Sequence, residues 1–508
     1  MTFHVLLDGV LLLHMLAACG LVLYGMNGYV MLALHCWARR RMLQHDAVVQ
    51  QRWQAGAPSY PRVTVQLPLY NECYVVERLI EAVVHLTYPR EQWEIHILDD
   101  STDATTALAA RLVAQYRQDG YNITLRHRQH RQGYKAGALQ EGLADATGEF
   151  IAIFDADFVP PPDFLVRTLP FFHDPTVAMV QTRWGHVNRE YSLLTRAQSL
   201  GIDGHFWVEQ AARCWSGLFM NFNGSGGIWR RQAIDDAGGW QADTLTEDLD
   251  LSYRAQLRGW RLHFVPQVVC PAEVPVQMSG VKSQQHRWAK GSIQVAKKLL
   301  PRILRADLPV FTKYQAILHL TNYLVHPFML LTALTTPLFL WMQTGVAAPV
   351  HVLSLVGLVV TTCGPTSLYI YAQRQLYADW RRRLRAFPAL LLFGTGIALS
   401  NTRAIVEALA NVRSSFVRTP KFRIEQEADT WRGKRYASPL SWFSLVEVLL
   451  AVYSGCGLAL AVARGASLAT PLLLLFTLGF AVVALLSLLE SVQRHVHTLQ
   501  QAPLDPEG

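Results

Sequence analysis

The hydrophobic positions of this chain follow two different patterns, which divide it into membrane and soluble parts. Long apolar runs cover residues 5–36 and return beyond residue 310, at about 316–343, 350–372, 443–463 and 468–490. Runs of this length predict helices that cross a membrane. The middle of the chain carries only short apolar segments separated by polar residues, as in a soluble protein. The pattern therefore predicts a soluble domain inserted into a bundle of transmembrane helices.

The soluble part alternates between segments with the hydrophobic pattern of strands and segments with that of amphipathic helices. Strands are predicted at 63–67, 93–98, 123–126 and 150–154, and helices at 75–86, 104–118 and 135–146. Strand and helix in alternation predict an α/β domain of Rossmann-like type, with a mostly parallel sheet and right-handed crossovers.

The same patterns suggest boundaries along the whole chain. We expect a transmembrane helix at 1–40, a polar connector at 41–61, the soluble domain at 62–283, a polar motif with an interfacial helix at 284–312, two transmembrane helices within 313–372, cytoplasmic loops at 373–442, two further transmembrane helices within 443–490, and a cytoplasmic tail at 491–508.

Segment 387–412 is apolar at first but carries Asn401, Arg403 and Glu407. Basic loops flank it on both sides, so one simple crossing does not fit, and it is too short to cross twice. We expect a re-entrant or interfacial helix here, with a tilted span as the alternative.

Composition supports a membrane protein. The 508 residues are 51% hydrophobic, and the formal net charge is +8. The basic clusters at residues 39–41 and 381–383 lie beside apolar runs, so the positive-inside rule explains them without nucleic acid. It also places the soluble domain in the cytoplasm, with the spans among the lipids of the plasma (inner) membrane. Seven scattered cysteines include no CxxC pair, so neither a structural zinc site nor a disulfide framework is indicated.

Polar residues follow the predicted strands where each strand ends. Pro68, Asn71 and Glu72 follow the first strand, Asp99 and Asp100 follow the second, Lys135 begins a helix, and Asp155 and Asp157 end the fourth strand. Doubly wound sheets bind their ligands at this edge. The sequence therefore predicts a ligand site there.

Asp155 and Asp157 would repel each other unless a cation lay between them. A hard divalent ion, Mg²⁺ or Mn²⁺, that also holds substrate phosphates would satisfy them. The alternative interpretation is a strand end with a capping Asp and a turn before Pro160. Similarly, Asp99 could belong to an ordinary turn, and Lys135 could be a solvated residue at a helix start.

Two later motifs complete the chemistry of glycosyl transfer from a nucleotide sugar. In Thr246-Glu247-Asp248 we expect Asp248 to be the general base for the acceptor hydroxyl. In the segment from Gln284 to Trp288, Arg287 would join Lys135 on the diphosphate, and Trp288 would stack on the acceptor sugar. One base opposite the leaving group implies inversion. Alternatively, Glu247 caps a helix, and the later motif begins an interfacial helix.

The order Asp99-Asp100, Asp155-Ala-Asp157, Thr246-Glu247-Asp248 and Gln284-Gln-His-Arg-Trp288 resembles the D, DxD, TED, QQxRW signature of the membrane glycosyltransferases that include cellulose, chitin and hyaluronan synthases. Gln132-Gly-Tyr-Lys-Ala-Gly137 and Phe222-Asn-Gly224 look most like the cellulose-synthase-like A and C branch, which makes mannan, glucomannan and glucan backbones.

The resemblance implies a GT-A catalytic domain, a β-linked product that grows on the enzyme, and a channel entrance at Trp288. UDP-glucose or GDP-mannose would be the donor. It implies catalytic roles for Asp248 and Glu247 and a metal bound by Asp155 and Asp157. The donor would contact Pro68, Asn71, Glu72, Asp99, Asp100, Lys135, Asp155, Gln284 and Arg287. The segment from Phe416 to Lys421 is similar to the F-x-V-T-x-K gating loop of cellulose synthases, with Arg418 in place of Val.

Three functions stay open at this point. The first is a processive synthase that carries its polysaccharide across the membrane, with secretion partner subunits beyond it. The second is a non-processive enzyme that adds one sugar to a membrane lipid. The third is a scaffold protein with an inactive transferase domain, against which the complete set of acidic motifs argues.

Overall fold

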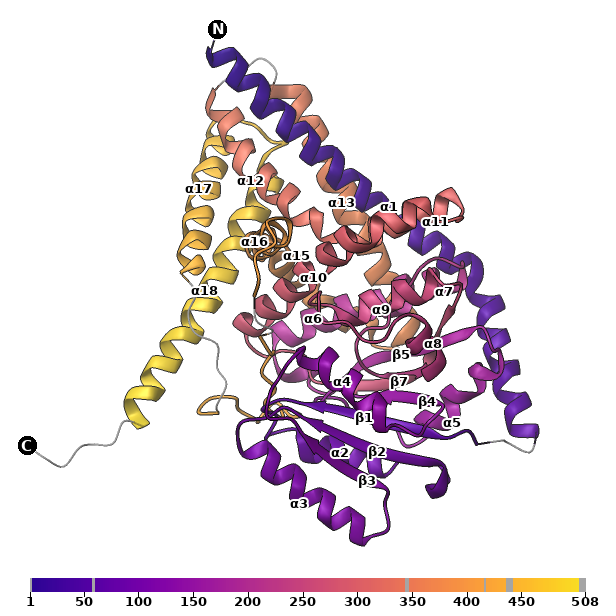
Figure 1. The fold of residues 1–508 in the computed structure, drawn as a ribbon. Coiled ribbons are helices and arrows are strands. Elements are labelled where there is room, and N and C mark those ends of the chain that lie inside the picture. The colour runs from indigo at the N-terminus through magenta and orange to yellow at the C-terminus, as the bar shows by residue number, and fades with distance from the viewer. Residues whose placement is uncertain (1, 57–59, 343–346, 415–416, 435–441, 502–508) are drawn as a thin grey trace, which may run out of the picture.

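The computed structural model describes residues 2–56, 60–342, 347–414, 417–434 and 442–501. A sheet domain with its helices lies at one end of the molecule, and long helices extend from the other end (Figure 1). Four helices in the described part are long and apolar enough to cross a membrane, or five if one bent pair counts as a span. The predicted α/β domain within a set of apolar helices is therefore confirmed.

The sheet has seven strands in the order β3-β2-β1-β4-β6-β5-β7. Strand β6 runs antiparallel to both of its neighbours, and the other pairs are parallel, so the predicted mostly parallel sheet is correct. The strands are β1 (Val63–Leu69), β2 (Trp93–Asp99), β3 (Ile123–His127), β4 (Phe150–Ile153), β5 (Val177–His186), β6 (Gly227–Arg230) and β7 (Arg261–Ala272).

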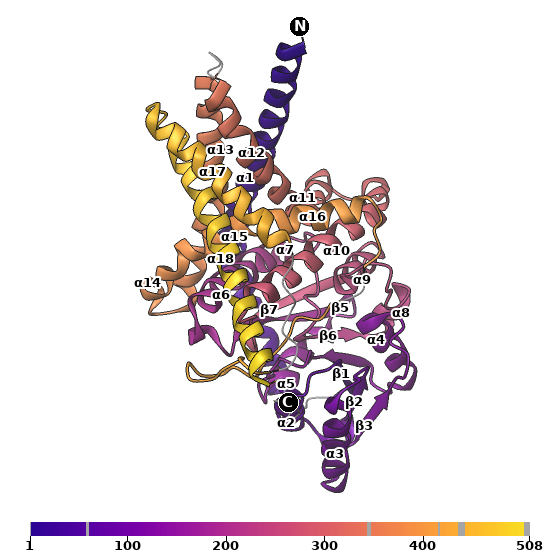
Figure 2. The same cartoon turned by 90° about the vertical axis from the view of Figure 1, so that its left-hand side faces the viewer.

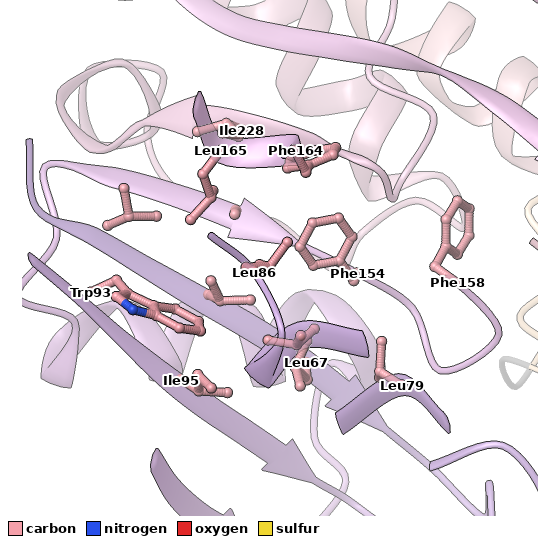
Figure 3. Close-up of a cluster of buried hydrophobic side chains, with 14 of the residues drawn as sticks. Leu67, Leu79, Leu86, Trp93, Ile95, Phe154, Phe158, Phe164, Leu165 and Ile228 are labelled. Carbon is pink, nitrogen blue, oxygen red and sulfur yellow. The ribbon is translucent and has the colours of Figure 1, made fainter. Parts of the chain in front are cut away.

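Helices cover both faces of the sheet, which explains why its central strand β4 is apolar at every position. Along β4, Phe150 and Ala152 belong to one buried cluster, and Ile151 and Ile153 belong to the other. Side chains of a strand alternate between the faces, so a strand that is covered twice carries no polar side. Figure 3 shows part of the first cluster, in which Phe154 lies beside Phe164 and near Leu67.

The helices of this domain connect successive strands. They are α2 (Val76–Val84), α3 (Ala104–Gln118), α4 (Tyr134–Asp145), α5 (Phe164–Thr168), α6 (Leu193–Gly204), α7 (Ala211–Trp215), α8 (Arg231–Asp236) and α9 (Glu247–Gln256). A π-helical segment, His205–Gln210, joins α6 to α7. Helix α9 starts at the Glu247-Asp248 motif, so both carboxylates lie in its first turn, where the helix dipole favours negative charge.

The first helix, α1 (Thr2–Ala55), is longer than expected. It continues through most of the segment predicted to be a polar connector, as Figure 1 shows in indigo. The extension is helical because it packs on the sheet domain: Asp46 is buried and lies 3.2 Å from Nε2 of His263. The polar composition of 41–55 thus reflects a helix with a solvent-exposed side. Part of the remaining connector, residues 57–59, lies outside the described residues.

Helix α10 (Met278–Arg305) also differs from the prediction. It begins well before Gln284, so the later motif is the middle of a helix, not its polar lead-in. Its start is capped by Glu490 of α18, which accepts hydrogen bonds from the backbone N–H groups of Met278 and Ser279. A distant carboxylate decides this boundary, which is why the local sequence does not reveal it.

The basic side of α10 bonds to protein, although the sequence suggested lipid head groups. Lys290 is fully buried and lies 2.9 Å from Oε2 of Glu407. Lys298 pairs with Asp243 and Asp250 at 2.8 and 2.9 Å. Lys290 and Lys298 therefore need no membrane surface to explain them, and whether the helix lies in a membrane interface stays a prediction.

The remaining helices are α11 (Val310–Leu320), α12 (Val325–Met342), α13 (Ala347–Leu376), α14 (Trp380–Arg383), α15 (Phe387–Gly396), α16 (Ala398–Leu409), α17 (Phe443–Ala463) and α18 (Thr470–Gln501). The four predicted spans after the soluble domain fall on α12, α13, α17 and α18, although α12 begins later than expected because α11 is a separate helix. Helix α13 is not among the described helices that are long and apolar enough to cross a membrane, so a span there stays a prediction.

Segment 387–412 forms α15 and α16, bent by 41° at their junction. Helix α16 runs across the direction of α12 and α17 (Figure 2), as an interfacial helix would. Its polar residues have partners: Asn401 bonds to His326 at 2.9 Å, and Arg403 bonds to Glu407 at 2.7 Å. The expectation that α15 and α16 form a re-entrant or interfacial segment, with a tilted span as the alternative, stays a prediction.

Candidate active site

A cleft of about 1250 Å³, including its open mouth, lies at the carboxyl edge of the sheet and against α10. Most residues expected at the site line it: Pro68, Glu72, Asp100, Lys135, Asp155, Asp157, Glu247, Asp248, Gln284, Arg287 and Trp288. These residues come from positions up to 220 apart in the sequence, Pro68 to Trp288, and the fold brings them to one place. Asn71 and Asp99 do not line the cleft.

The Asp155 and Asp157 carboxylates each face an ammonium group. Nζ of Lys135 lies 2.6 Å from Oδ1 of Asp155, and Nζ of Lys421 lies 2.7 Å from Oδ2 of Asp157. Although burial lowers the pKa of Lys135, Asp155 and Glu247 hold it above its usual value. The pair thus already attracts positive charge from two separate segments.

This pair fits a divalent cation only with help from the substrate. Within the described residues, no group of three or more His, Cys, Asp or Glu side chains could hold a metal alone. Two carboxylates plus phosphate oxygens and water are a common ligand set for Mg²⁺. Asp155 and Asp157 therefore suit a metal that arrives with a diphosphate.

Asp248 is placed to act as a base. It lies in the first turn of α9, accepts a hydrogen bond from the N–H of Leu249, and faces Gly224, where an added Cβ would lie 2.9 Å from Oδ2. Burial and the neighbouring Glu247 carboxylate raise the pKa of Asp248 to about 7. A carboxylate with a pKa near the working pH can take a proton from a hydroxyl group efficiently.

Gly224 makes this approach possible. Its φ of +84° is a conformation that L side chains rarely adopt, and its carbonyl accepts a hydrogen bond from Nζ of Lys135 at 2.8 Å. The neighbouring hydroxyl of Ser225 accepts a hydrogen bond from the N–H of Asp155 at 2.9 Å. The Asn223-Gly224-Ser225 segment therefore joins the metal side of the cleft to the base.

Helix α10 presents one side to the cleft and the other to α16. Gln284, Arg287 and Trp288 are three and four residues apart, which places them on one face. His286, between them in the sequence, points to α16, where Nε2 lies 3.2 Å from Oε2 of Glu407. This contact gives His286 a structural role, because it joins α10 to α16.

The two aspartates at the end of β2, Asp99 and Asp100, have different surroundings. Asp99 is fully buried, and its carboxylate bonds to Ser101, Thr106 and His127. Asp100 lines the cleft, but Arg128 holds both of its oxygens at 2.6 Å. Asp99 therefore supports the turn, which was the alternative interpretation of that residue, and only Asp100 is left at the ligand side.

Asn71 and Glu72, which follow β1, also differ, because only Glu72 lines the cleft. Asn71 has φ of +55°, and its side-chain oxygen accepts a hydrogen bond from the N–H of Thr102, so it ties the turns after β1 and β2 together. Glu72 lies in the cleft and pairs with Arg418. Burial raises the pKa of Glu72 to about 7, against the lowering effect of Arg418.

The loop similar to a gating motif reaches the cleft. Arg418, Thr419 and Lys421 line it, although they lie far along the chain from β1 and β4. The N–H of Phe422 donates a hydrogen bond to Oε1 of Glu273 at 2.9 Å, which fixes the loop beside the end of β7. Phe416, the first residue of the motif, lies outside the described residues. A gating role for the loop stays a prediction.

Several lining residues were not expected from the sequence. They are Tyr70, Arg131, Trp184, His186, Ile202 and Glu273. The guanidinium of Arg131 lies 3.4 Å from the ring centroid of Tyr70, and both residues line the cleft. A signal existed for two of them, because Trp184 and His186 stand at the end of a strand, where the other site residues were found.

Residues 61–291 match the model of a protein family described as glycosyltransferase like family 2. The soluble domain is a family 2 glycosyltransferase domain with the GT-A fold. The family predicted from the motifs is thereby confirmed.

Similar curated proteins include the probable glucomannan 4-β-mannosyltransferase 6 of Oryza sativa subsp. japonica, 40% identical over 60% of this chain and 53% of the rice protein. Glucomannan 4-β-mannosyltransferase 7 of Arabidopsis thaliana is 36% identical over 68% of this chain and 64% of that protein. The chain thus spans a little more than half the length of these relatives. Their names agree with the predicted cellulose-synthase-like branch.

Among solved structures, the chain is similar to the mannosyltransferase of Pyrobaculum calidifontis in complex with GDP-Man and Mn²⁺. That match is 23% identical, covers 76% of this chain and 99% of that one, and has a TM-score of 0.48. Staphylococcus aureus TarS is 16% identical, with 69% of this chain and 55% of that chain covered and a TM-score of 0.38.

Proposed function

We propose that the protein is an inverting, nucleotide-sugar-dependent glycosyltransferase that builds a β-linked mannan or glucomannan chain at a membrane. The observation that carries this proposal is the meeting of four parts in one cleft: the Asp155–Asp157 pair, Lys135, Asp248 and Trp288. The glucomannan 4-β-mannosyltransferases among its relatives support a mannosyl donor, for which we propose GDP-mannose. Mg²⁺ or Mn²⁺ is the proposed metal.

The donor occupies the sheet side of the cleft in this proposal. Asp155 and Asp157 would hold the metal, which would offset the charge that develops on the leaving diphosphate. Lys135 and Arg287 supply further positive charge beside it. In this proposal Tyr70, Asp100 and Arg131 face the nucleoside, because they follow β1, β2 and β3, which lie together on one side of β4 in the sheet.

Transfer is a single displacement. A hydroxyl oxygen of the acceptor attacks C1 of the donor sugar while the bond from C1 to the diphosphate oxygen breaks. The hydroxyl proton passes to the Asp248 carboxylate, and the nucleoside diphosphate leaves. Attack from the side opposite the leaving group converts an α-linked donor into a β-linked product.

The product side supports a processive reaction that also carries the chain across the membrane. Trp288 is on a helix whose two ends contact apolar helices, with Glu490 of α18 at its start and α11 after its end. We propose that the growing glycan leaves the cleft between these helices, with the catalytic domain in the cytoplasm and the spans in the plasma (inner) membrane.

The test is a donor screen with purified full-length protein in nanodiscs. Labelled GDP-mannose and UDP-glucose are supplied with Mn²⁺ or Mg²⁺, and the product is separated by ethanol precipitation and lipid extraction. We expect ethanol-insoluble material from GDP-mannose that β-mannanase degrades. The Asp248→Asn variant in the same nanodiscs is the matched control.

Other results of the donor screen would change or overturn the proposed function. A labelled product that extracts into organic solvent would replace the polymer with a lipid acceptor. No product from either donor, with wild type equal to Asp248→Asn, would overturn the proposal. Proteoliposomes test transport: polymer made from external donor that resists external β-mannanase until detergent is added indicates translocation.

A further inference from the structure

The C-terminal end of β5 carries a histidine that lines the cleft. The reaction described above does not use this histidine. His186 is the last residue of β5, and its ring lines the cleft with Trp184 two residues earlier. Residues two apart on a strand share a face, so the indole and the imidazole belong to one wall. The His186 side chain is only 4% exposed, which means that its neighbours hold the ring in place.

The group that holds His186 is Asp203 of α6. Nε2 of His186 lies 3.1 Å from Oδ1 of Asp203, and the Asp203 side chain is fully buried. A buried carboxylate is costly unless its oxygens accept hydrogen bonds. Burial raises the pKa of Asp203, but His186 and the donors around it outweigh this and hold the pKa below its usual value. Asp203 is therefore an anion facing the ring.

Two more donors to Asp203 come from the apolar helix α13 and the residue that follows it. Nε2 of Gln373 donates to Oδ2 at 2.7 Å, and the hydroxyl of Tyr377 donates to Oδ1 at 3.2 Å. The next residue, Gly204, lets α13 approach closely, because an added Cβ there would lie 2.4 Å from the ring of Tyr369. The imidazole is thus tied through one carboxylate to a helix on the membrane side.

This arrangement sets the chemistry of the ring. An ionised carboxylate at Nε2 keeps the proton on that nitrogen, so the lone pair of the neutral ring is on Nδ1. A neutral imidazole held in this tautomer accepts a hydrogen bond from a hydroxyl group. Sugars offer hydroxyl donors at every ring, and indole faces such as Trp184 and Trp288 provide stacking surfaces nearby.

We propose that His186, oriented by Asp203, binds a hydroxyl group of the acceptor glycan and helps to select it. The inference rests on the proposed function and names a contact of the same site. The acceptor is favoured over the donor because β5 is separated from β4 by β6, while the donor side of the cleft is built from β1, β2 and β4. The bonds from Gln373 and Tyr377 to Asp203 also tie His186 to α13, one of the helices outside the sheet domain.

The test compares His186→Gln with His173→Gln, since His173 is an exposed histidine far from the cleft lining. Binding of β-1,4-mannotetraose to the full-length protein in nanodiscs is measured by isothermal titration calorimetry, in the presence of GDP. We expect His186→Gln to weaken binding about three- to tenfold, as for one lost hydrogen bond between uncharged groups. The His173→Gln variant binds as wild type does.

The Asp203→Asn variant tests whether Asp203 acts by orienting the His186 ring or whether the substitution merely disturbs the fold. It should weaken tetraose binding less than His186→Ala does, and the double variant should bind no worse than His186→Ala alone, because Asp203 acts through the ring. The Kd for GDP with Mn²⁺ should be unchanged in all variants. An unchanged GDP Kd shows that the fold and the donor side are intact, whatever happens to the tetraose.

Two results overturn the inference. One is a His186→Gln variant that binds the tetraose like wild type, and the other is a wild-type protein that does not bind it at all. These differ from failure of the proposed function. A wild type that binds the tetraose through His186 but transfers no mannose from GDP-mannose refutes the reaction and leaves the contact standing.

Discussion

The two sides of the cleft are built in different ways. On the donor side, Glu72, Asp100, Lys135, Asp155 and Asp157 follow strands or begin helices of one continuous α/β unit. On the acceptor side, Trp288 is on α10, whose start is capped by Glu490 of α18 and whose Lys290 pairs with Glu407 of α16. The donor side is therefore built mainly from one α/β unit, to which the later loop adds Arg418 and Lys421, and the acceptor side depends on helices from the end of the chain.

The difference suggests a division of labour. The donor is a small, soluble molecule, for which a sheet edge is sufficient. In the proposed reaction the acceptor is a growing glycan that leaves between the apolar helices, and its site is held by those helices. If this is right, changes on one side should leave the binding step of the other side intact. The following predictions test that separation, from the largest expected effect to the smallest.

The Asp248→Asn substitution should have the largest effect. Asn keeps the size of the side chain but cannot take the proton of the attacking hydroxyl, and a general base contributes roughly 10²- to 10⁴-fold to the rate. We expect a loss of about 10³-fold in mannosyl transfer. GDP binding with Mn²⁺ should be unchanged, as measured by calorimetry. A variant that keeps more than a tenth of the activity would remove Asp248 from the role of base.

Asp155→Asn and Asp157→Asn should come next. Each removes one of two carboxylates that hold the metal, and a bound metal ion stabilises the departing charge by several kcal/mol. We expect at least about a 10²-fold loss of transfer and loss of the Mn²⁺ dependence of GDP binding. Binding of mannotetraose should not change. If tetraose binding weakened as much as GDP binding, the two sides would not be separate.

The pH dependence follows from Asp248. Its pKa is raised to about 7 by burial and by Glu247, and the base works only when ionised. We expect kcat/KM for the acceptor to fall as the pH drops below 7, approaching a tenfold loss for each further pH unit. The measurement is a rate profile from pH 5 to 9 at saturating donor. A flat profile between pH 5 and 7 would contradict this pKa.

The Lys282–Glu447 pair tests the attachment of the acceptor side. Nζ of Lys282 on α10 lies 2.7 Å from Oε1 of Glu447 on α17, and Glu447 is 1% exposed. Breaking such a pair leaves a buried charge and costs about 3 kcal/mol of stability. We expect Glu447→Gln to lower the thermal midpoint in detergent and to weaken tetraose binding a few-fold, with GDP binding unchanged.

The matched control is Asp145→Asn, which breaks an exposed pair with Arg126 on the donor side. Exposed pairs contribute less than about 1 kcal/mol, so its thermal midpoint should stay close to that of wild type. A double variant Lys282→Met with Glu447→Leu should recover part of the lost stability, because no charge is left buried. Equal destabilisation by Glu447→Gln and Asp145→Asn would contradict the proposed attachment.

The sequence by itself determined much of this protein. Strands that are apolar on both faces, such as residues 150–153, predict a covered parallel sheet, and polar residues at their ends predict a site at one edge. Asp155 and Asp157 were found in this way, Lys135 was found at a predicted helix start and Asp248 in the Thr246-Glu247-Asp248 motif, and all four line the cleft. Periodicity and strand ends are local properties, so a chain read in order reveals them.

Tertiary structure alone decided the rest. It directs Asp99 into a turn, starts α10 at Met278 under the carboxylate of Glu490, and places Arg418 and Lys421 against Glu72 and Asp157. It also joins His186 to Asp203 and α13. Each of these features depends on a partner that is far away in the sequence, or on the direction in which a side chain points from a turn. No local pattern encodes such a partner, because hydrogen bonds and ion pairs are chosen only when the chain has packed.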